Sequence, residues 1–168
     1  ESSFTYNPEK AIQLLEEADI LLISPGVPID APVVLAAREK GVTVTGELEM
    51  ASVLLNGDMV AISGTNGKTT TTTLVGRIFE NAGRITHVAG NIGYPLSAVA
   101  RVSKKTDMSV VEVSSFQLES IRTFHPKVAA LLNITEDHLN RHGTMAQYIK
   151  LKQRLFENQK ATDVAVLN

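Results

Sequence analysis

The chain has 168 residues, of which 43% are hydrophobic and 20% charged, and its formal net charge is −2 at pH 7. This composition is typical of a globular protein with a real core, and the charge gives no electrostatic reason to expect nucleic acid or a membrane as a partner. Cysteine is absent, which excludes disulfides and thiolate metal sites. Because neither an apolar run of ~18 residues nor a signal peptide is recognisable, we expect a cytoplasmic protein.

Short apolar runs rich in β-branched residues alternate with helical patterns along the chain. In chain order, strands are predicted at Ile20–Ser24, Val42–Thr45 (the weakest), Met59–Ser63, Ser109–Val113, Val128–Asn133 and Val164–Leu167. Helices are predicted from Pro32 to a stop at Gly41, from Lys68 to a stop at Gly83, and over Met145–Asn158. This alternation predicts an α/β fold with a doubly wound, mainly parallel sheet and helices on both faces.

A domain boundary is predicted near Gly46, where a strand–helix–strand unit gives way to the segment that leads into a glycine-rich loop. Residues 1–46 are interpreted as the C-terminal part of a Rossmann-like domain, and residues 47–168 as most of a second domain. The chain begins at Glu1 rather than at a methionine and stops directly after a strand, so we expect a piece of a longer protein.

The stretch "SGTNGKTT" (Ser63–Thr70) follows a predicted strand and opens a predicted helix, which is the context of a phosphate-binding loop. The usual spacing, G-x-x-x-x-G-K-[ST], would need a glycine where this chain has Ile62. A glycine turn followed by a solvated lysine is the alternative, and we favour the phosphate loop because strand, glycines, lysine, hydroxyl and helix occur together. The candidate ATP-binding residues are Gly64, Thr65, Asn66, Gly67, Lys68, Thr69 and Thr70.

The spacing of this loop resembles the ATP-binding loop of the Mur ligase family, G-T-N-G-K-[ST], and further segments match the family in the expected order. They are "SPGVP" (Ser24–Pro28), "GNIG" (Gly90–Gly93), "EVSSFQLE" (Glu112–Glu119), "NITEDHLNRHG" (Asn133–Gly143) and "KQRLFEN" (Lys152–Asn158). Asn140 stands where the family usually has aspartate. The form of "EVSSFQLE" resembles that of the members that add D-glutamate.

The resemblance implies an ATP-dependent ligase of peptidoglycan precursor synthesis, which joins an amino acid to a carboxylate through an acyl phosphate. The implied substrates are UDP-N-acetylmuramoyl-L-alanine and D-glutamate, and the implied cofactors are ATP and two Mg²⁺ ions. It also implies that residues 1–46 belong to the domain that binds the uridine nucleotide, and a monomer is expected. The family's third domain has no counterpart in this sequence, so we expect the fragment alone to be inactive.

The same resemblance implies roles for individual residues. The catalytic residues are Lys68, His138 and Lys152, and the implied Mg²⁺ ligands are Thr69, Glu112, His138 and Lys152, the last as a carbamate formed with CO₂. The implied substrate-binding residues are Ser24, Pro25, Gly26, Asn91, Ser114, Ser115, Asn133 and Asp137. The chemistry needs cations because the γ-phosphoryl group and the attacking carboxylate are both negative.

Several of these residues have simpler interpretations. Ser114 and Ser115 are also suited to cap the next helix, Asn91 to occupy a turn, and Lys152 to lie on the surface. A zinc site at His138 and His142 is disfavoured because "HLNRH" lacks the glutamate of H-E-x-x-H. The alternatives for function are another Mur-type ligase such as a folylpolyglutamate synthetase, a different P-loop enzyme such as a kinase or GTPase, and a nucleotide-binding module without catalysis.

Overall fold

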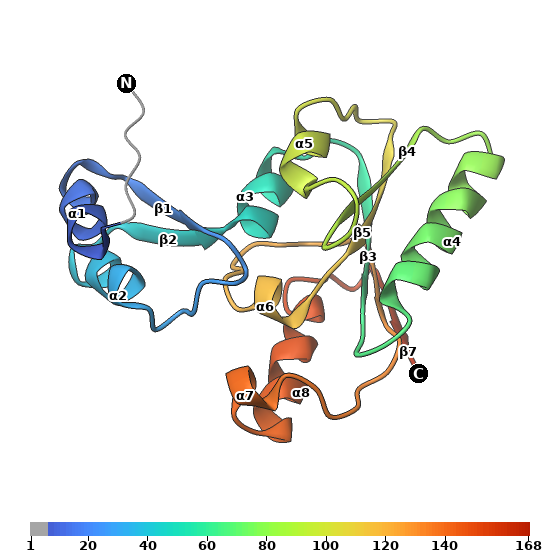
Figure 1. Ribbon diagram of the computed structural model, residues 1–168. Coiled ribbons are helices and arrows are strands. Elements are labelled where there is room, and N and C mark those ends of the chain that lie inside the picture. Colours follow the sequence, from blue (N-terminus) through green and yellow to red (C-terminus); the bar gives the residue numbers. More distant parts are fainter. Residues whose placement is uncertain (1–6) are drawn as a thin grey trace.

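The computed structural model describes residues 7–168. It contains two parallel β-sheets (Figure 1). The smaller sheet pairs β1 (Ile20–Ile23) with β2 (Thr43–Gly46), and its helices are α1 (Pro8–Gln13), followed by a 3₁₀ turn (Leu14–Glu17), and α2 (Pro32–Glu39). The larger sheet contains β3 (Asp58–Ser63), β4 (Thr86–Gly90), β5 (Met108–Glu112), β6 (Val128–Leu131) and β7 (Val164–Leu167). Its strand order is β4-β5-β3-β6-β7 and every pair is parallel. The predicted α/β fold with a parallel sheet is therefore confirmed.

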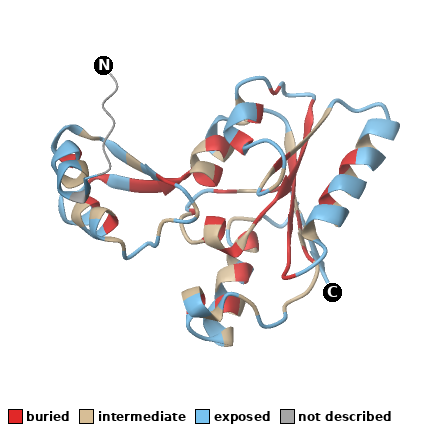
Figure 2. Ribbon diagram, in the orientation of Figure 1, coloured by how far each residue is buried: buried red, intermediate tan, exposed pale blue. Residues whose placement is uncertain are grey.

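Helices cover both faces of the larger sheet, and each face has its own hydrophobic cluster (Figures 1 and 2). On one face α4 (Lys68–Asn81) packs Val75 and Phe79, one helical turn apart, against Val60 and Ile62 of β3. The helices on the other face are α3 (Glu47–Leu54), α5 (Leu96–Ala100), α6 (Ser115–Leu118) and α8 (Met145–Gln153) with its 3₁₀ extension (Arg154–Phe156). The central strands β3 and β5 are thus covered on both faces, which explains why their sequences are largely apolar.

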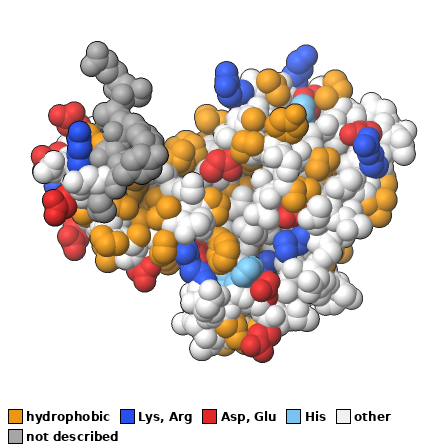
Figure 3. All heavy atoms as spheres, in the orientation of Figure 1, with side chains coloured by type: hydrophobic (Ala, Val, Ile, Leu, Met, Phe, Trp, Pro, Cys, Tyr) orange, Lys and Arg blue, Asp and Glu red, His pale blue; other side chains and the backbone are white. Residues whose placement is uncertain are grey.

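The smaller sheet has a separate hydrophobic cluster, in which Ile23 and Val44 of the strands meet Val34 and Ala37 of α2. Hydrophobic side chains also remain exposed over this part of the molecule (Figure 3), among them Leu22 of β1 at 54% exposure. β2 ends at Gly46 and α3 begins at the next residue. The division of the chain into two domains at this point stays a prediction.

The element boundaries differ from the sequence-based ones in a few places. β4 was not predicted, because its segment T-H-V-A-G contains a histidine and a glycine in only five residues. The helix predicted to reach Asn158 leaves α geometry after Gln153. The N-cap of α4 is Gly67, and no side chain caps this helix. None of the helices in residues 7–168 is long and apolar enough to cross a membrane.

A buried carboxylate on α3 fastens the loop that leads into β6. Glu49 is 6% exposed and accepts hydrogen bonds from the backbone N–H groups of Arg122 (2.9 Å), Thr123 (2.8 Å) and Phe124 (3.0 Å), and from the Thr123 hydroxyl (2.6 Å). Burial alone raises the pKa of Glu49, but these hydrogen bonds outweigh it and leave the pKa below its ordinary value. Glu49 therefore stabilises the fold as a carboxylate.

We predict that Glu49→Gln lowers the free energy of unfolding at pH 7 by about 2 kcal/mol, because an ionised acceptor is replaced by a neutral one. The pKa of Glu49 is lower in the folded than in the unfolded protein. Its contribution is therefore present above the unfolded pKa of about 4.3 and disappears as pH falls through the folded pKa. Urea unfolding at several pH values measures this difference, with Glu39→Gln on the exposed end of α2 as the control. Equal stability of the Glu49→Gln variant and the unmodified chain at pH 7 would contradict the assignment.

Candidate functional site

The loop between β3 and α4 presents the N-terminus of a long helix at the carboxyl edge of the larger sheet. Gly67 has a φ of +79°, a left-handed conformation that favours glycine, and it is the N-cap of α4. Because no side chain caps this terminus, its backbone N–H groups and the positive end of the helix dipole are directed toward an anion-binding position. The predicted loop thus has the backbone of a phosphate site despite Ile62, which is 1% exposed and part of the core.

The side chain of Asn133, just beyond β6, fixes the shape of this loop. Its Oδ1 accepts hydrogen bonds from the backbone N–H groups of Thr65 (3.1 Å) and Asn66 (2.9 Å), and its Nδ2 donates to the carbonyl of Asn66 (3.0 Å). Asn133 therefore acts on the loop itself in this structure. Its predicted contact with substrate stays a prediction.

Lys68, the first residue of α4, lies over the same loop. Its Nζ donates to the carbonyl oxygens of Gly64 (3.0 Å) and Thr65 (2.8 Å). A positive charge is thus placed beside the helix N-terminus, where it adds to the attraction of phosphate groups.

Glu112 joins three segments at the carboxyl end of β5. This side chain is 1% exposed, and its carboxylate accepts hydrogen bonds from the hydroxyl of Thr69 (2.8 Å) and from Nδ2 of Asn91 (2.8 Å). Gly90 makes the approach of Asn91 possible, because a Cβ at Gly90 would lie 2.3 Å from the backbone oxygen of Glu112. The burial of Glu112 is therefore matched by hydrogen bonds, and Asn91 contacts the carboxylate in addition to forming a turn.

His138 has a strained backbone. Its φ of +52° makes it the one non-glycine residue with positive φ among residues 7–168. Its N–H donates to Oδ1 of Asp137 (2.9 Å), and its ring centroid lies 4.9 Å from that of Phe116. Strain of this kind is most common at functional sites.

Lys152, predicted to be either a functional residue or a surface lysine, is buried with 1% exposure. Its Nζ donates to Oγ of Ser63 (3.0 Å) and to the carbonyl of Gly64 (2.9 Å), at the start of the phosphate loop. Burial is the largest cause that lowers the pKa of Lys152, to about 7, and the charge of Lys68 lowers it further. A large share of the Lys152 side chains is consequently neutral near pH 7, whereas Lys150 on the same helix is exposed.

Many of the predicted site residues line one cavity of about 160 Å³. It is lined by Lys68, Asn91, Ser114, Ser115, Asp137, His138 and Lys152, together with Phe116 and Tyr148. This volume suits phosphate groups rather than a whole nucleotide, since complete ligand pockets are usually about 300 Å³ or larger. Thr69 and Glu112 do not line the cavity, but Glu112 accepts a hydrogen bond from Asn91, which does line it.

The two serines of "EVSSFQLE" line the cavity and also make hydrogen bonds that stabilise the fold around it. Ser114 caps α6, with its Oγ accepting from the N–H of Gln117 (3.3 Å). Ser115 is 3% exposed and its Oγ lies 3.0 Å from Nε2 of His142. Burial is the main cause that lowers the pKa of His142.

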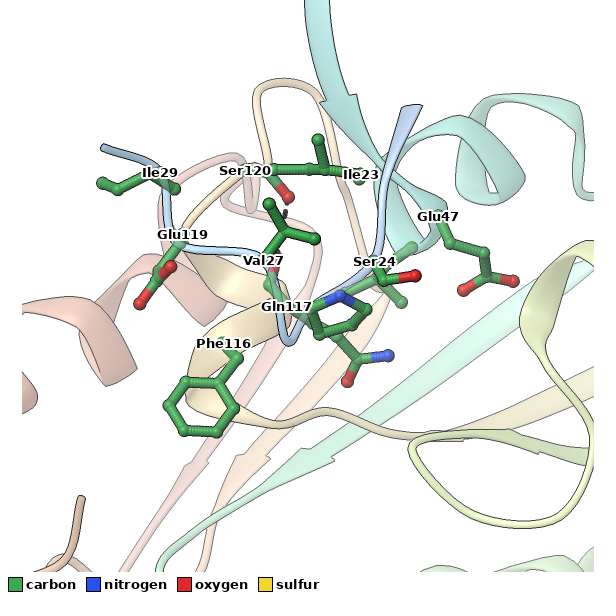
Figure 4. Close-up of a pocket in the computed structure, with 12 residues that line it drawn as sticks. Ile23, Ser24, Val27, Ile29, Glu47, Phe116, Gln117, Glu119 and Ser120 are labelled. Carbon is green, nitrogen blue, oxygen red and sulfur yellow. Dashed lines mark hydrogen bonds between the residues drawn. The ribbon is translucent and has the colours of Figure 1, made fainter. Parts of the chain in front are cut away.

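The predicted substrate residues of the first part of the chain lie at a different cavity. Ser24 and Pro25 line a cleft between their loop and α6, in which Val27 and Ile29 lie opposite Phe116 and Glu119 (Figure 4). Gly26 is exposed and is not among the residues that line this cleft. Phe116 is a lining residue of both cavities.

The donor set fits a hard divalent cation next to phosphate. The Thr69 hydroxyl and the Glu112 carboxylate are oxygen donors of the kind that Mg²⁺ prefers, 2.8 Å apart at the helix N-terminus. Within residues 7–168, no three His, Asp or Glu side chains converge to hold a metal by themselves. Mg²⁺ at this position would consequently need further oxygen ligands, such as phosphate oxygens and water, which is usual for this ion.

Tyr148 and Ser63 are site residues that sequence reasoning missed. The Tyr148 hydroxyl lies 3.2 Å from Oγ1 of Thr65, and its ring lies 5.5 Å from Nζ of Lys152. Tyr148 precedes Lys152 by one helical turn, and this spacing was the available signal. No comparable signal exists for Ser63, whose partner is 89 residues away.

Comparison with known proteins identifies the family. Residues 62–168 match the Mur ligase middle domain. The chain belongs to the Mur ligase family. It is 53% identical over 156 residues to the UDP-N-acetylmuramoylalanine--D-glutamate ligase of Alkaliphilus oremlandii (strain OhILAs), an alignment that covers 93% of this chain and 34% of that protein.

Solved structures of Mur ligases share the fold. The UDP-N-acetylmuramate:L-alanyl-gamma-D-glutamyl-meso-diaminopimelate ligase from Neisseria meningitides superimposes with a TM-score of 0.62 at 21% identity, covering 94% of this chain and 54% of that one. MurF ligase from Thermotoga maritima in complex with ADP gives 0.58 at 19% identity, covering 89% and 42%. This chain spans about a third of the length of the curated relatives it matches.

Proposed function

We propose that the whole protein is an ATP-dependent ligase that adds D-glutamate to UDP-N-acetylmuramoyl-L-alanine through an acyl phosphate, in the synthesis of peptidoglycan precursors. The observation that carries the proposal is the cavity where Lys68, His138 and the buried Lys152 meet at the N-terminus of α4. The name of the relative at 53% identity supports D-glutamate as the amino acid, and the ADP in a structural neighbour supports the nucleotide.

In this proposal the chain's residues bring two anions together. The helix N-terminus and Lys68 would attract the terminal phosphates of ATP, Thr69 and Glu112 would hold one Mg²⁺ ion, and His138 would hold the second. When bound, the ions would supply positive charge that screens the phosphoryl group from the substrate carboxylate. Asn91, Ser114, Ser115 and Asp137 line the same cavity and are assigned to the substrate. Ser24, Pro25 and Gly26 are assigned to the uridine-linked part of the substrate.

Lys152 is proposed to react as a neutral amine with CO₂, forming an N–C bond and releasing one proton to water, and the resulting carbamate would bind Mg²⁺. Its burial and its lowered pKa support this role, because the neutral amine is the form that attacks CO₂. An ammonium group would instead be repelled by Lys68 and by a nearby metal ion. The expected cytoplasmic location and monomeric state stay predictions.

We predict that the full-length protein releases phosphate from ATP only when UDP-N-acetylmuramoyl-L-alanine and D-glutamate are both present. L-alanine, meso-diaminopimelate and L-lysine should each fail to replace D-glutamate. A phosphate-release assay with the four amino acids tests this, with Lys68→Ala as the inactive control. Turnover with another amino acid alone would refute the assignment, and robust turnover by the isolated 168-residue chain would refute the need for further domains.

We predict that Lys152→Ala loses most ligase activity, because the carbamate cannot form, whereas Lys150→Ala on the exposed side of the same helix stays nearly as active as the unmodified protein. Short-chain carboxylic acids should partly restore Lys152→Ala by occupying the position of the missing anion. Initial rates with and without added acid provide the measurement. An active Lys152→Ala variant, or electron density for an unmodified Lys152 at high bicarbonate, would contradict the carbamate.

A further inference from the structure

Arg141, in the short helix α7 (Leu139–His142), connects the two parts of the chain, namely the residues before Gly46 and the residues after it. Its Nη2 donates to the backbone oxygen of Val27 (3.1 Å), in the loop that follows β1. The same guanidinium forms a two-pronged contact with Glu119 on α6, through Nη2 to Oε2 (2.6 Å) and Nε to Oε1 (3.1 Å). Within residues 9–168, the bond to Val27 is the one hydrogen bond that joins residues before Gly46 to residues after it.

The surroundings of Arg141 make this contact stronger than an ordinary surface ion pair. The side chains of Arg141 and Glu119 are 20% and 8% exposed, so water screens them poorly. The guanidinium carbon also lies 5.4 Å from the centre of the Phe116 ring. Hydrogen bonding to Glu119 is the main cause that raises the pKa of Arg141, which therefore remains charged.

The three segments that meet at Arg141 are the ones that carry the proposed site. Val27 follows the loop residues Ser24, Pro25 and Gly26 assigned to the substrate. Glu119 directly follows α6, which begins with the cavity residue Ser115. α7 starts directly after His138, and the N–H of Arg141 donates to the carbonyl of His138 (2.9 Å).

The covalent connection at Gly46 is the other point at which the residues before Gly46 are held to the rest of the chain. At Gly46 a Cβ would lie 2.2 Å from Oγ of Ser120, so the end of β2 is packed directly on the segment after α6. The covalent link alone would allow the loop around Val27 to swing about this point. A second attachment at Val27 removes that freedom.

We propose that Arg141 is a positioning residue that holds the Ser24–Pro28 loop against α6 and α7, and so sets where a substrate bound by that loop meets the His138 cavity. The identity of that substrate rests on the proposed function, whereas the mechanical link does not. Lysine cannot replace Arg141, because one ammonium group cannot reproduce the two-pronged contact with Glu119 and also reach Val27.

Distances between spin labels test the link directly. The 168-residue sequence has no cysteine, so labels can be attached at Gly26→Cys, where a Cβ meets nothing within 4 Å, and at the exposed Lys150→Cys on α8. The labelled protein is the full-length one, with any cysteine outside this sequence replaced by serine. We expect a narrow distance distribution that broadens in Arg141→Ala and in the milder Arg141→Lys.

Arg154→Lys is the matched control, because Arg154 makes its contacts within one part of the chain. Its guanidinium donates to the carbonyl oxygens of Leu118 (2.6 Å), Glu119 (3.0 Å) and Ile121 (2.6 Å). We expect this variant to keep the narrow distribution. Narrow distributions in both Arg141 variants, or equal broadening in Arg154→Lys, would overturn the proposal.

Kinetics give a readout that a merely structural arginine would not change. We expect Arg141→Lys to raise the KM for the uridine-linked substrate about tenfold, the effect of losing one charge-assisted hydrogen bond, with the KM for ATP unchanged. An equal rise in both KM values would overturn the positioning role. Absence of ligase activity in the unmodified protein would refute the proposed function instead, and the label distances would still decide the role of Arg141.

Discussion

A buried carboxylate at the carboxyl end of β5 holds the candidate site together. Glu112 receives hydrogen bonds from Thr69 at the start of α4 and from Asn91 after β4, so it ties the phosphate loop to the neighbouring strand. A negative charge with 1% exposure needs such partners, and each partner is thereby fixed in position. The first turn of α4 and the turn after Gly90 are thus held to the same group.

Two lysines of different character lie near this carboxylate. Lys68 is partly exposed and interacts with loop carbonyls, whereas Lys152 is buried beside Ser63. Burial is the largest cause that lowers the pKa of Lys152, to about 7, and the charge of Lys68 lowers it further, while Asp137 and Glu112 partly offset the shift. The same surroundings thus hold one lysine at the loop carbonyls and favour the neutral form of the other.

The sequence predicts those features that local physical rules determine. Apolar runs and glycine stops locate most strands and helices, and strand, glycines and lysine in succession locate the phosphate loop. Contacts between distant residues follow no such rule. The hydrogen bonds of Asn133 to the loop, of Ser63 to Lys152 and of Arg141 to Val27 span 67, 89 and 114 residues. They depend on the assembled fold, so the burial of Lys152 and the role of Arg141 emerge only from the structure.

We propose that Glu112 and Thr69 complete a Mg²⁺–phosphate site at the N-terminus of α4. Calorimetric titration of ATP into the full-length protein, with and without Mg²⁺, tests it most directly when unmodified protein and Glu112→Gln are compared. We expect Mg²⁺ to strengthen ATP binding in the unmodified protein and to have little effect in the variant, which keeps the side-chain shape but lacks the charge. The same Mg²⁺ dependence in both proteins would contradict the account.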